Sequence, residues 1–143
     1  MQHVGVTGPR RLTPEREAWL REQLQGLLGP ETHLHVGDAD GVDRLAREEG
    51  RKRGPMTVYR VEGKERWHYQ ARSKRLVEAL AQLGGTLYAY PNKPRPVGLT
   101  PNNWQGSGTW GTIAYAQSRG VQVHITPLPG LELEEEPTQL TLW

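Results

Sequence analysis

The stretch from His33 to Leu45, HLHVGDADGVDRL, decides the fold class of this chain. Histidine and apolar residues alternate up to Gly37, which is the period-two pattern of a strand. An acidic turn between Gly37 and Gly41 follows, and apolar residues then recur at helical spacing. A strand, a glycine turn and a helix N-terminus together direct free N–H groups and the positive end of the helix dipole at one place. The stretch therefore predicts an anion-binding turn.

This turn carries neither of two well-known nucleotide-binding motifs. Its spacing is not the dinucleotide fingerprint G-x-G-x-x-G, and it lacks the Gly-Lys-Ser/Thr ending of a P-loop. The alternative interpretation is an ordinary strand-to-helix turn in which Asp40 caps the helix.

Length and composition are those of one ordinary domain. The chain has 143 residues, contains no apolar run long enough to cross a membrane, and begins almost at once with a strand pattern. We therefore expect a cytoplasmic protein without a signal peptide. The chain contains no cysteine, which excludes disulfides and thiolate metal ligands and is typical of a reducing compartment.

Positive charge is concentrated within the chain. The formal net charge is +2, but four glutamates follow residue 131, so residues 1–131 carry +6. Eleven Lys or Arg residues fall between Arg44 and Arg75. This pattern indicates an anionic ligand or nucleic acid, and a solvated basic helix face is the alternative.

Strand and helix patterns alternate along the chain. We expect strands at 3–7, 33–36, 57–61, 86–90 and 121–125, and helices at 14–28, 41–53, 67–83 and 108–119. This alternation predicts an α/β fold, a three-layer parallel sheet of about five strands with helices on both faces. We expect one domain over residues 1–126 and a tail over 127–143.

Three glycine-bearing loops follow predicted strands and should meet at one sheet edge. They lie at 8–10, 37–43 and 106–109, the last within GSGTWGTIAYA. Ligands of such sheets bind beyond the carboxyl ends of the strands, so three loops there favour a phosphate site. The alternative is that these glycines only make tight turns.

The same segments resemble the SLOG superfamily of Rossmann-like domains, which includes DNA-processing protein A and the LOG phosphoribohydrolases. The resemblance rests on VGVTGPR at 4–10, VGDADGVDRLA at 36–46, ARSKR at 71–75 and GSGTWGTIAYAQSRGVQV at 106–123. It covers about residues 3–125 and implies a Rossmann-like, nucleotide-binding domain. One difference concerns catalysis: the phosphoribohydrolases carry a Glu three positions after the Gly-Thr pair, where this chain has Thr112. Because Thr supplies no carboxylate, we expect no enzymatic activity, although nearby aspartates are candidates to replace the Glu.

We therefore expect a sensor or carrier of a nucleotide or nucleotide-derived ligand, with no cofactor. The ligand-binding residues that we expect are Gly8, Arg10, Gly37, Asp38, Asp40, Gly41, Asp43, Arg72, Gly106, Ser107, Gly108, Thr109 and Thr112. Two alternatives stay open: a nucleoside 5′-monophosphate phosphoribohydrolase, and a DNA-associated factor. Trp19 and Trp110 are candidates for a homo-oligomer contact, with core packing as the alternative.

Two further groups of residues are candidate sites. His33 and His35 share one strand face, but no helical carboxylate at ligand spacing supports them, so we expect no metal site. Trp67, His68 and Tyr69 either stack on a base or seal the third helix against the sheet.

The chain ends in an apolar segment. Gln139, Leu140, Leu142 and Trp143 resemble the bacterial sliding-clamp-binding peptide Gln-Leu-x-Leu-Phe. Docking of this segment on the protein itself or on a neighbouring subunit is the favoured interpretation, and binding of a clamp through these four residues is the hypothesis set against it.

Overall fold

The computed structural model describes residues 1–131, and the clamp-like peptide at 139–143 lies outside this part. Strands and helices alternate as β1 (Gln2–Thr7), α1 (Pro14–Leu27), β2 (Thr32–Gly37), α2 (Val42–Arg53), β3 (Met56–Tyr59), α3 (Arg66–Leu83), β4 (Thr86–Ala89), α4 (Gly108–Ser118) and β5 (Gln122–Ile125). None of these helices is long and apolar enough to cross a membrane.

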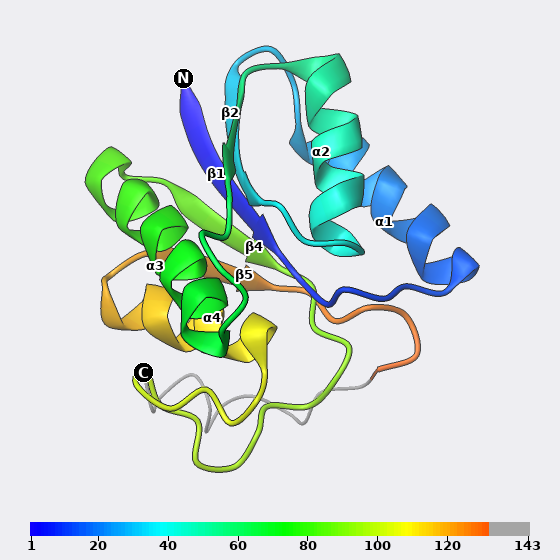
Figure 1. Ribbon diagram of the computed structural model, residues 1–143. Coiled ribbons are helices and arrows are strands. Elements are labelled where there is room, and N and C mark those ends of the chain that lie inside the picture. Colours follow the sequence, from blue (N-terminus) through cyan, green and yellow to red (C-terminus); the bar gives the residue numbers. More distant parts are fainter. Residues whose placement is uncertain (132–143) are drawn as a thin grey trace.

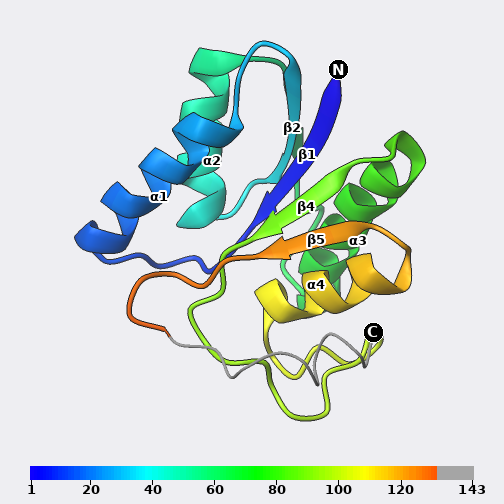
Figure 2. The same cartoon turned by 180° about the vertical axis from the view of Figure 1, so that it is seen from behind.

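Within residues 1–131 the strands form one five-stranded parallel sheet in the order β3-β2-β1-β4-β5. Helices α1 and α2 cover one face of the sheet, and α3 and α4 cover the other (Figures 1 and 2). The chain changes face between β3 and β4, so the connections that leave β1 and β4, which pair side by side, diverge. The predicted three-layer α/β architecture is confirmed.

Local signals explain most of the element boundaries. Thr13 caps α1, and its hydroxyl accepts a hydrogen bond from the N–H of Arg16 at 3.2 Å. The strand predicted at 57–61 ends two residues early, at Tyr59. The N–H of Val61 is instead bound to the carboxylate of Asp38 at 3.0 Å, a partner 23 residues away that no local pattern predicts.

Apolar side chains fill both interfaces between sheet and helices. Leu20, Leu24 and Leu45 are fully buried between the sheet and the α1–α2 layer. On the opposite face α3 lies very close to β1, because Gly5 has no side chain: a Cβ there would lie 2.6 Å from Leu80. Leu128, just past the predicted domain boundary at 126, is also fully buried in the first core.

Candidate functional site: a basic pocket at the strand ends

A pocket of about 780 Å³ opens at the carboxyl ends of β1, β2 and β4. This is the place where the connections of an open parallel sheet diverge and where such folds bind ligands. The volume lies within the roughly 300–1,000 Å³ range of small-molecule sites. The residues that line this basic pocket are Thr7, Gly8, Pro9, Arg10, Arg11, Ala39, Asp43, Lys64, Arg66, Tyr69, Gln70, Arg72, Ser73, Asn92, Lys93, Trp104, Gly106, Ser107, Gly108, Thr109 and Thr112.

The N-terminus of α4 forms one wall of the basic pocket. Ser107 caps this helix, and its hydroxyl accepts a hydrogen bond from the N–H of Trp110 at 3.1 Å. The N–H groups of Gly108 and Thr109 precede the intrahelical hydrogen bonds and stay available to a ligand. A Cβ added at Gly106 or Gly108 would meet no atom within 4 Å, so the backbone here faces open space. This wall suits an anion such as phosphate.

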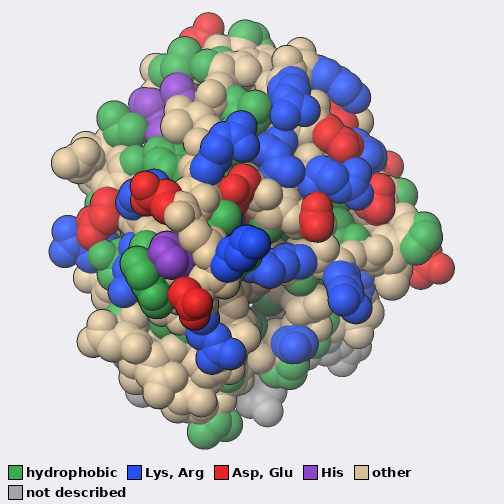
Figure 3. Space-filling view, in the orientation of Figure 1, with side chains coloured by type: hydrophobic (Ala, Val, Ile, Leu, Met, Phe, Trp, Pro, Cys, Tyr) green, Lys and Arg blue, Asp and Glu red, His purple; other side chains and the backbone are tan. Residues whose placement is uncertain are grey.

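Five exposed cations surround the same pocket. They are Arg10, Arg11, Lys64, Arg66 and Lys93. None of them forms an ion pair with any residue in the described part of the chain. Figure 3 shows Lys and Arg side chains gathered around the centre of this face of the molecule. Their charges are free to attract an anionic ligand.

Behind the pocket, two aspartates and Arg72 pack around Gly37. Arg72 pairs with Asp38, with Nη1 and Oδ1 2.7 Å apart, and only 10% of its side chain is exposed. Asp43 is buried and accepts a hydrogen bond from the N–H of Ala39 at 3.3 Å. Burial raises the pKa of Asp43 to about 6, against the opposing effect of the positive charge on Arg72. Among the described residues, Asp43 is the one carboxylate that lines the pocket.

Comparison with known proteins identifies this architecture. No family model matches the chain, and no curated protein matches it in sequence. DNA processing protein A from Streptococcus pneumoniae superposes on 92% of this chain with a TM-score of 0.69 and 16% identity. The chain has the fold of the matched part of DNA processing protein A.

A second solved structure supports the same comparison. DNA processing protein A from Helicobacter pylori, described in a study of its single-stranded DNA binding mode, matches 92% of this chain with a TM-score of 0.61 and 15% identity. The matched regions cover 52% of the pneumococcal protein and 67% of the Helicobacter protein, so this chain spans about half the length of the former. The Rossmann-like fold implied by the SLOG resemblance is confirmed.

Most of the predicted ligand-binding residues meet at the pocket of this DNA processing protein A fold. Those that line it are Gly8, Arg10, Asp43, Arg72, Gly106, Ser107, Gly108, Thr109 and Thr112. Gly37 lines a narrow recess beside the pocket, and Asp38, Asp40 and Gly41 do not line it. Whether these residues bind a ligand stays a prediction.

The proposed capping role of Asp40 is wrong. Gly41 is the N-cap of α2, it has a φ of +69°, and no side chain caps this helix end. A Cβ at Gly41 would collide with the carbonyl oxygen of Pro9, so the β1–α1 loop itself requires glycine here. Asp40 is exposed and leaves the helix start to the backbone.

Thr112 lines the pocket but directs its hydroxyl into its own helix. The hydroxyl donates to the carbonyl oxygen of Gly108 at 2.7 Å. This contact uses the hydroxyl hydrogen for the backbone, and Thr112 supplies no charge to the pocket. The position of Thr112 therefore gives no support to the phosphoribohydrolase alternative, which stays a prediction.

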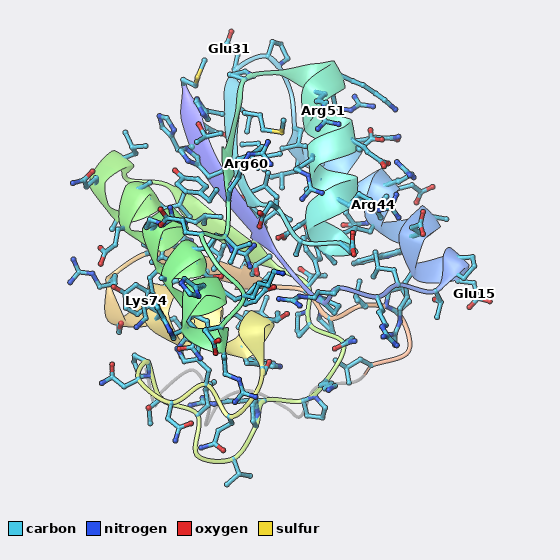
Figure 4. The ribbon with its side chains drawn as sticks, viewed as in Figure 1. Glu15, Glu31, Arg44, Arg51, Arg60 and Lys74 are labelled. Carbon is cyan, nitrogen blue, oxygen red and sulfur yellow. The ribbon has the colours of Figure 1, made fainter. Side chains whose placement is uncertain are left out.

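Only part of the basic segment at 44–75 is free to bind an anion. Along α2, Arg44 pairs with Glu48, while Lys52 and Arg53 pair with Glu49. Figure 4 labels Arg44 and Arg51 on α2 and Lys74 on α3. The free cations of the pocket come partly from outside this segment, because Arg10, Arg11 and Lys93 belong to the loops after β1 and β4.

The aromatic residues of the site are partly those expected from the sequence. Tyr69 lines the pocket, and the guanidinium of Arg10 lies 4.6 Å from the centre of its ring. Trp67 does not seal α3 against the sheet, because it is 63% exposed and stacks on His68. Trp110, a candidate for a subunit contact, is buried instead.

Sequence reasoning missed Trp104 and Lys93, which lie in the long loop after β4. Trp104 is buried, its indole N–H donates to the carbonyl oxygen of Pro101 at 2.8 Å, and its ring occupies the space beside Gly111. Trp110 donates in the same way to the carbonyl oxygen of Lys93 at 2.8 Å. The two indoles hold this loop over the pocket. The available signal was the spacing of tryptophans around the Gly-Ser-Gly-Thr turn.

Proposed function

We propose that the protein binds a nucleotide by its phosphate in the basic pocket. The observation that carries this proposal is the combination of five exposed cations, none with an ion-pair partner within residues 1–131, and an accessible helix N-terminus around one cavity. Backbone N–H groups of Gly108 and Thr109 supply hydrogen bonds to phosphate oxygens, and the helix dipole adds partial positive charge at the same point. The cations supply the long-range attraction.

The rest of the pocket suits the remainder of a nucleotide. The guanidinium of Arg10 and the ring of Tyr69 together present a flat, cationic surface of the kind on which nucleobases stack. Asn92 and Gln70 add neutral polar groups for sugar or base. A sensor or carrier needs no more than these binding contacts.

A second candidate extends the first: the nucleotide is one unit of single-stranded DNA. A nucleoside monophosphate carries about two negative charges, whereas the pocket presents five cations that have no ion-pair partner in the described part of the chain. A strand places successive phosphates along such a surface, which accounts for the excess positive charge. The similarity in fold to DNA processing protein A from Helicobacter pylori, whose study concerns single-stranded DNA binding, favours the same substrate.

The experiment compares the two ligands on the same protein. Fluorescence anisotropy with a labelled oligo-dT strand and calorimetry with a mononucleotide give two affinities at matched salt. If all five cations contact phosphates, log affinity for the strand should fall with log salt at a slope of about −3.5, because each neutralised phosphate contributes about −0.7. Mononucleotide binding as tight as strand binding would refute the strand candidate and leave the nucleotide proposal standing.

Charge variants locate the binding surface. Arg66→Gln should bring the slope for the oligonucleotide to about −2.8, since it removes one phosphate contact. The matched control is Arg51→Gln, which removes an exposed cation from α2, outside the pocket lining. Equal effects of both variants would show that binding follows net charge and not this pocket.

A backbone variant tests the wall formed by α4. Gly108→Val fills the open space at the helix start, so phosphate should lose its N–H partners and affinity should fall at least tenfold. Gly37→Val is a poor test, because its Cβ would lie 2.6 Å from a carboxylate oxygen of Asp43 and would disturb the pocket indirectly. Unchanged affinity of Gly108→Val for both ligands would refute the phosphate site.

A further inference from the structure

Three histidines from two strands meet on the α3 face of the sheet, away from the basic pocket. His3 lies opposite His33 in the parallel register of β1 and β2, and His35 follows two residues later on the same face. One ring nitrogen from each lies within 4.8 Å of the others. Figure 3 shows histidine side chains gathered at the upper edge of the molecule. This is the one such group of potential metal ligands in the described part of the chain.

The spacing of these nitrogens is close to what a metal ion requires. His3 Nδ1 and His35 Nε2 are 2.9 Å apart, and the His33 and His35 rings stack with their centres 4.7 Å apart. Tetrahedral zinc, with Zn–N bonds of about 2.0–2.1 Å, holds its imidazole nitrogens roughly 3.3 Å apart. The 2.9 Å distance lies slightly below that value, and no separation within the group exceeds 4.8 Å, so rotations of the side chains can bring the nitrogens to the spacing that zinc requires.

Hydroxyl groups of β3 orient two of the three rings. Tyr59 contacts Nδ1 of His35 at 2.9 Å, and Thr57 contacts Nε2 of His33 at 2.7 Å. These contacts leave Nε2 of His35 and Nδ1 of His33 for an ion. Metal-binding histidines almost always use their second nitrogen for such a hydrogen bond, which fixes the ring and its tautomer.

Burial differs among the three rings. Burial, together with the neighbouring histidines, lowers the pKa of His35 to about 4 and lowers that of His33 as well. His35 is buried, whereas His3 and His33 are half exposed, so an ion has access from solvent.

We propose that His3, His33 and His35 form a binding site for a divalent transition-metal ion of the zinc class, with water in the fourth position. Three neutral imidazoles without a carboxylate suit Zn²⁺ and Co²⁺ and discriminate against Mg²⁺ and Ca²⁺, which prefer oxygen ligands. The sequence predicted no metal site, because only His33 and His35 could be placed on the same face of one strand. His3 comes from another strand, 30 residues earlier in the chain.

The metal site is independent of the nucleotide proposal, because none of its ligands lines the basic pocket. An ion bound here connects β1 to β2 and, through Thr57 and Tyr59, contacts β3. Because the ion binds the folded state, it should raise the melting temperature.

Calorimetry with Zn²⁺ tests the proposal on the full chain, prepared without a polyhistidine tag and stripped with a chelator. We expect one Zn²⁺ per chain, a higher melting temperature with Zn²⁺, and no such effect of Mg²⁺. Co²⁺ should give the visible absorption of a tetrahedral site. Absence of Zn²⁺ binding at millimolar concentration would refute the proposal, and the cluster would then be only a hydrogen-bonded stack that holds the strands together.

Variants assign the ligands. His3→Gln and His33→Gln alter half-exposed rings, and each should weaken Zn²⁺ binding at least 100-fold, while Tyr59→Phe should weaken it about tenfold. The matched control is His124→Gln on β5, which is exposed and stacks on Tyr88 outside the cluster. Circular dichroism verifies the folding of each variant. The assignment would be overturned if His124→Gln weakened Zn²⁺ binding as much as the cluster variants do, or if neither His3→Gln nor His33→Gln weakened it.

Discussion

Replacing Asp43 by Asn should make the protein more stable at neutral pH, and the gain should depend on pH. Asp43 is buried at the base of the basic pocket, and Arg72, the cation that most favours its ionised form, is paired with Asp38. Burial therefore raises the pKa of Asp43 from 3.8 to about 6. A carboxyl group with a raised pKa binds its proton more tightly in the folded state, so the folded state loses stability as pH rises from about 4 to 6.

The magnitude follows from the pKa difference. The pKa of Asp43 is about 2.2 higher in the folded state. At 1.36 kcal/mol for each pH unit, ionised Asp43 destabilises the folded state by about 3 kcal/mol at neutral pH. Roughly 1 kcal/mol of this destabilisation is already present at pH 4.5, because the carboxyl group of Asp43 is largely ionised in the unfolded state at that pH. Asn has the same shape and no charge, so the stability of Asp43→Asn relative to wild type should rise by about 2 kcal/mol between pH 4.5 and 7.5.

Urea unfolding of both proteins at the two pH values measures this double difference, in which other titrating groups cancel. Asp40→Asn, which removes an exposed carboxylate from the same loop, is the control for general charge effects. A double difference near zero would refute the argument from burial. A negative value would show that Asp43 is stabilised as an ion, with Arg72 as its partner.

Three further outcomes follow from the same contacts. Affinity for an oligonucleotide should increase as pH falls from 7.5 to 5.5, because Asp43 loses its negative charge near pH 6 while the phosphodiesters stay charged. In anisotropy titrations, Asp43→Asn should abolish this pH dependence of the affinity. Gly41→Ala should destabilise the fold by about 1–3 kcal/mol, because position 41 has a positive φ and an added Cβ would collide with Pro9. Gly26→Ala, at an exposed position of α1, should instead stabilise the fold by about 0.5–1 kcal/mol, and equal effects of the two variants in urea unfolding would contradict this reasoning. Leu80→Ala should lower the unfolding free energy by about 2–5 kcal/mol, since Leu80 is fully buried against Gly5, and a loss below 1 kcal/mol would mean that α3 is not packed as described.

The local part of the fold was predictable from the chain. The cap at Thr13 and the helix start at Gly108 depend on residues within a few positions of each other. Such signals act through backbone geometry and hydrogen bonds of short reach, so one sequence suffices to detect them. The convergence of the three glycine loops also followed, because parallel strands place their carboxyl ends at one edge.

The role of each charged and polar side chain was decided by the tertiary structure. Arg72 neutralises Asp38 across 34 positions, and His3 meets His35 across 32. Sequence alone determined that this chain forms a parallel α/β sheet, and it predicted an anion-binding edge. Which cations stay unpaired at that edge, and which histidines form a cluster, depends on contacts between distant segments. Coulomb and coordination interactions act over a few ångströms in space and not along the chain, so only the folded structure assigns these partners.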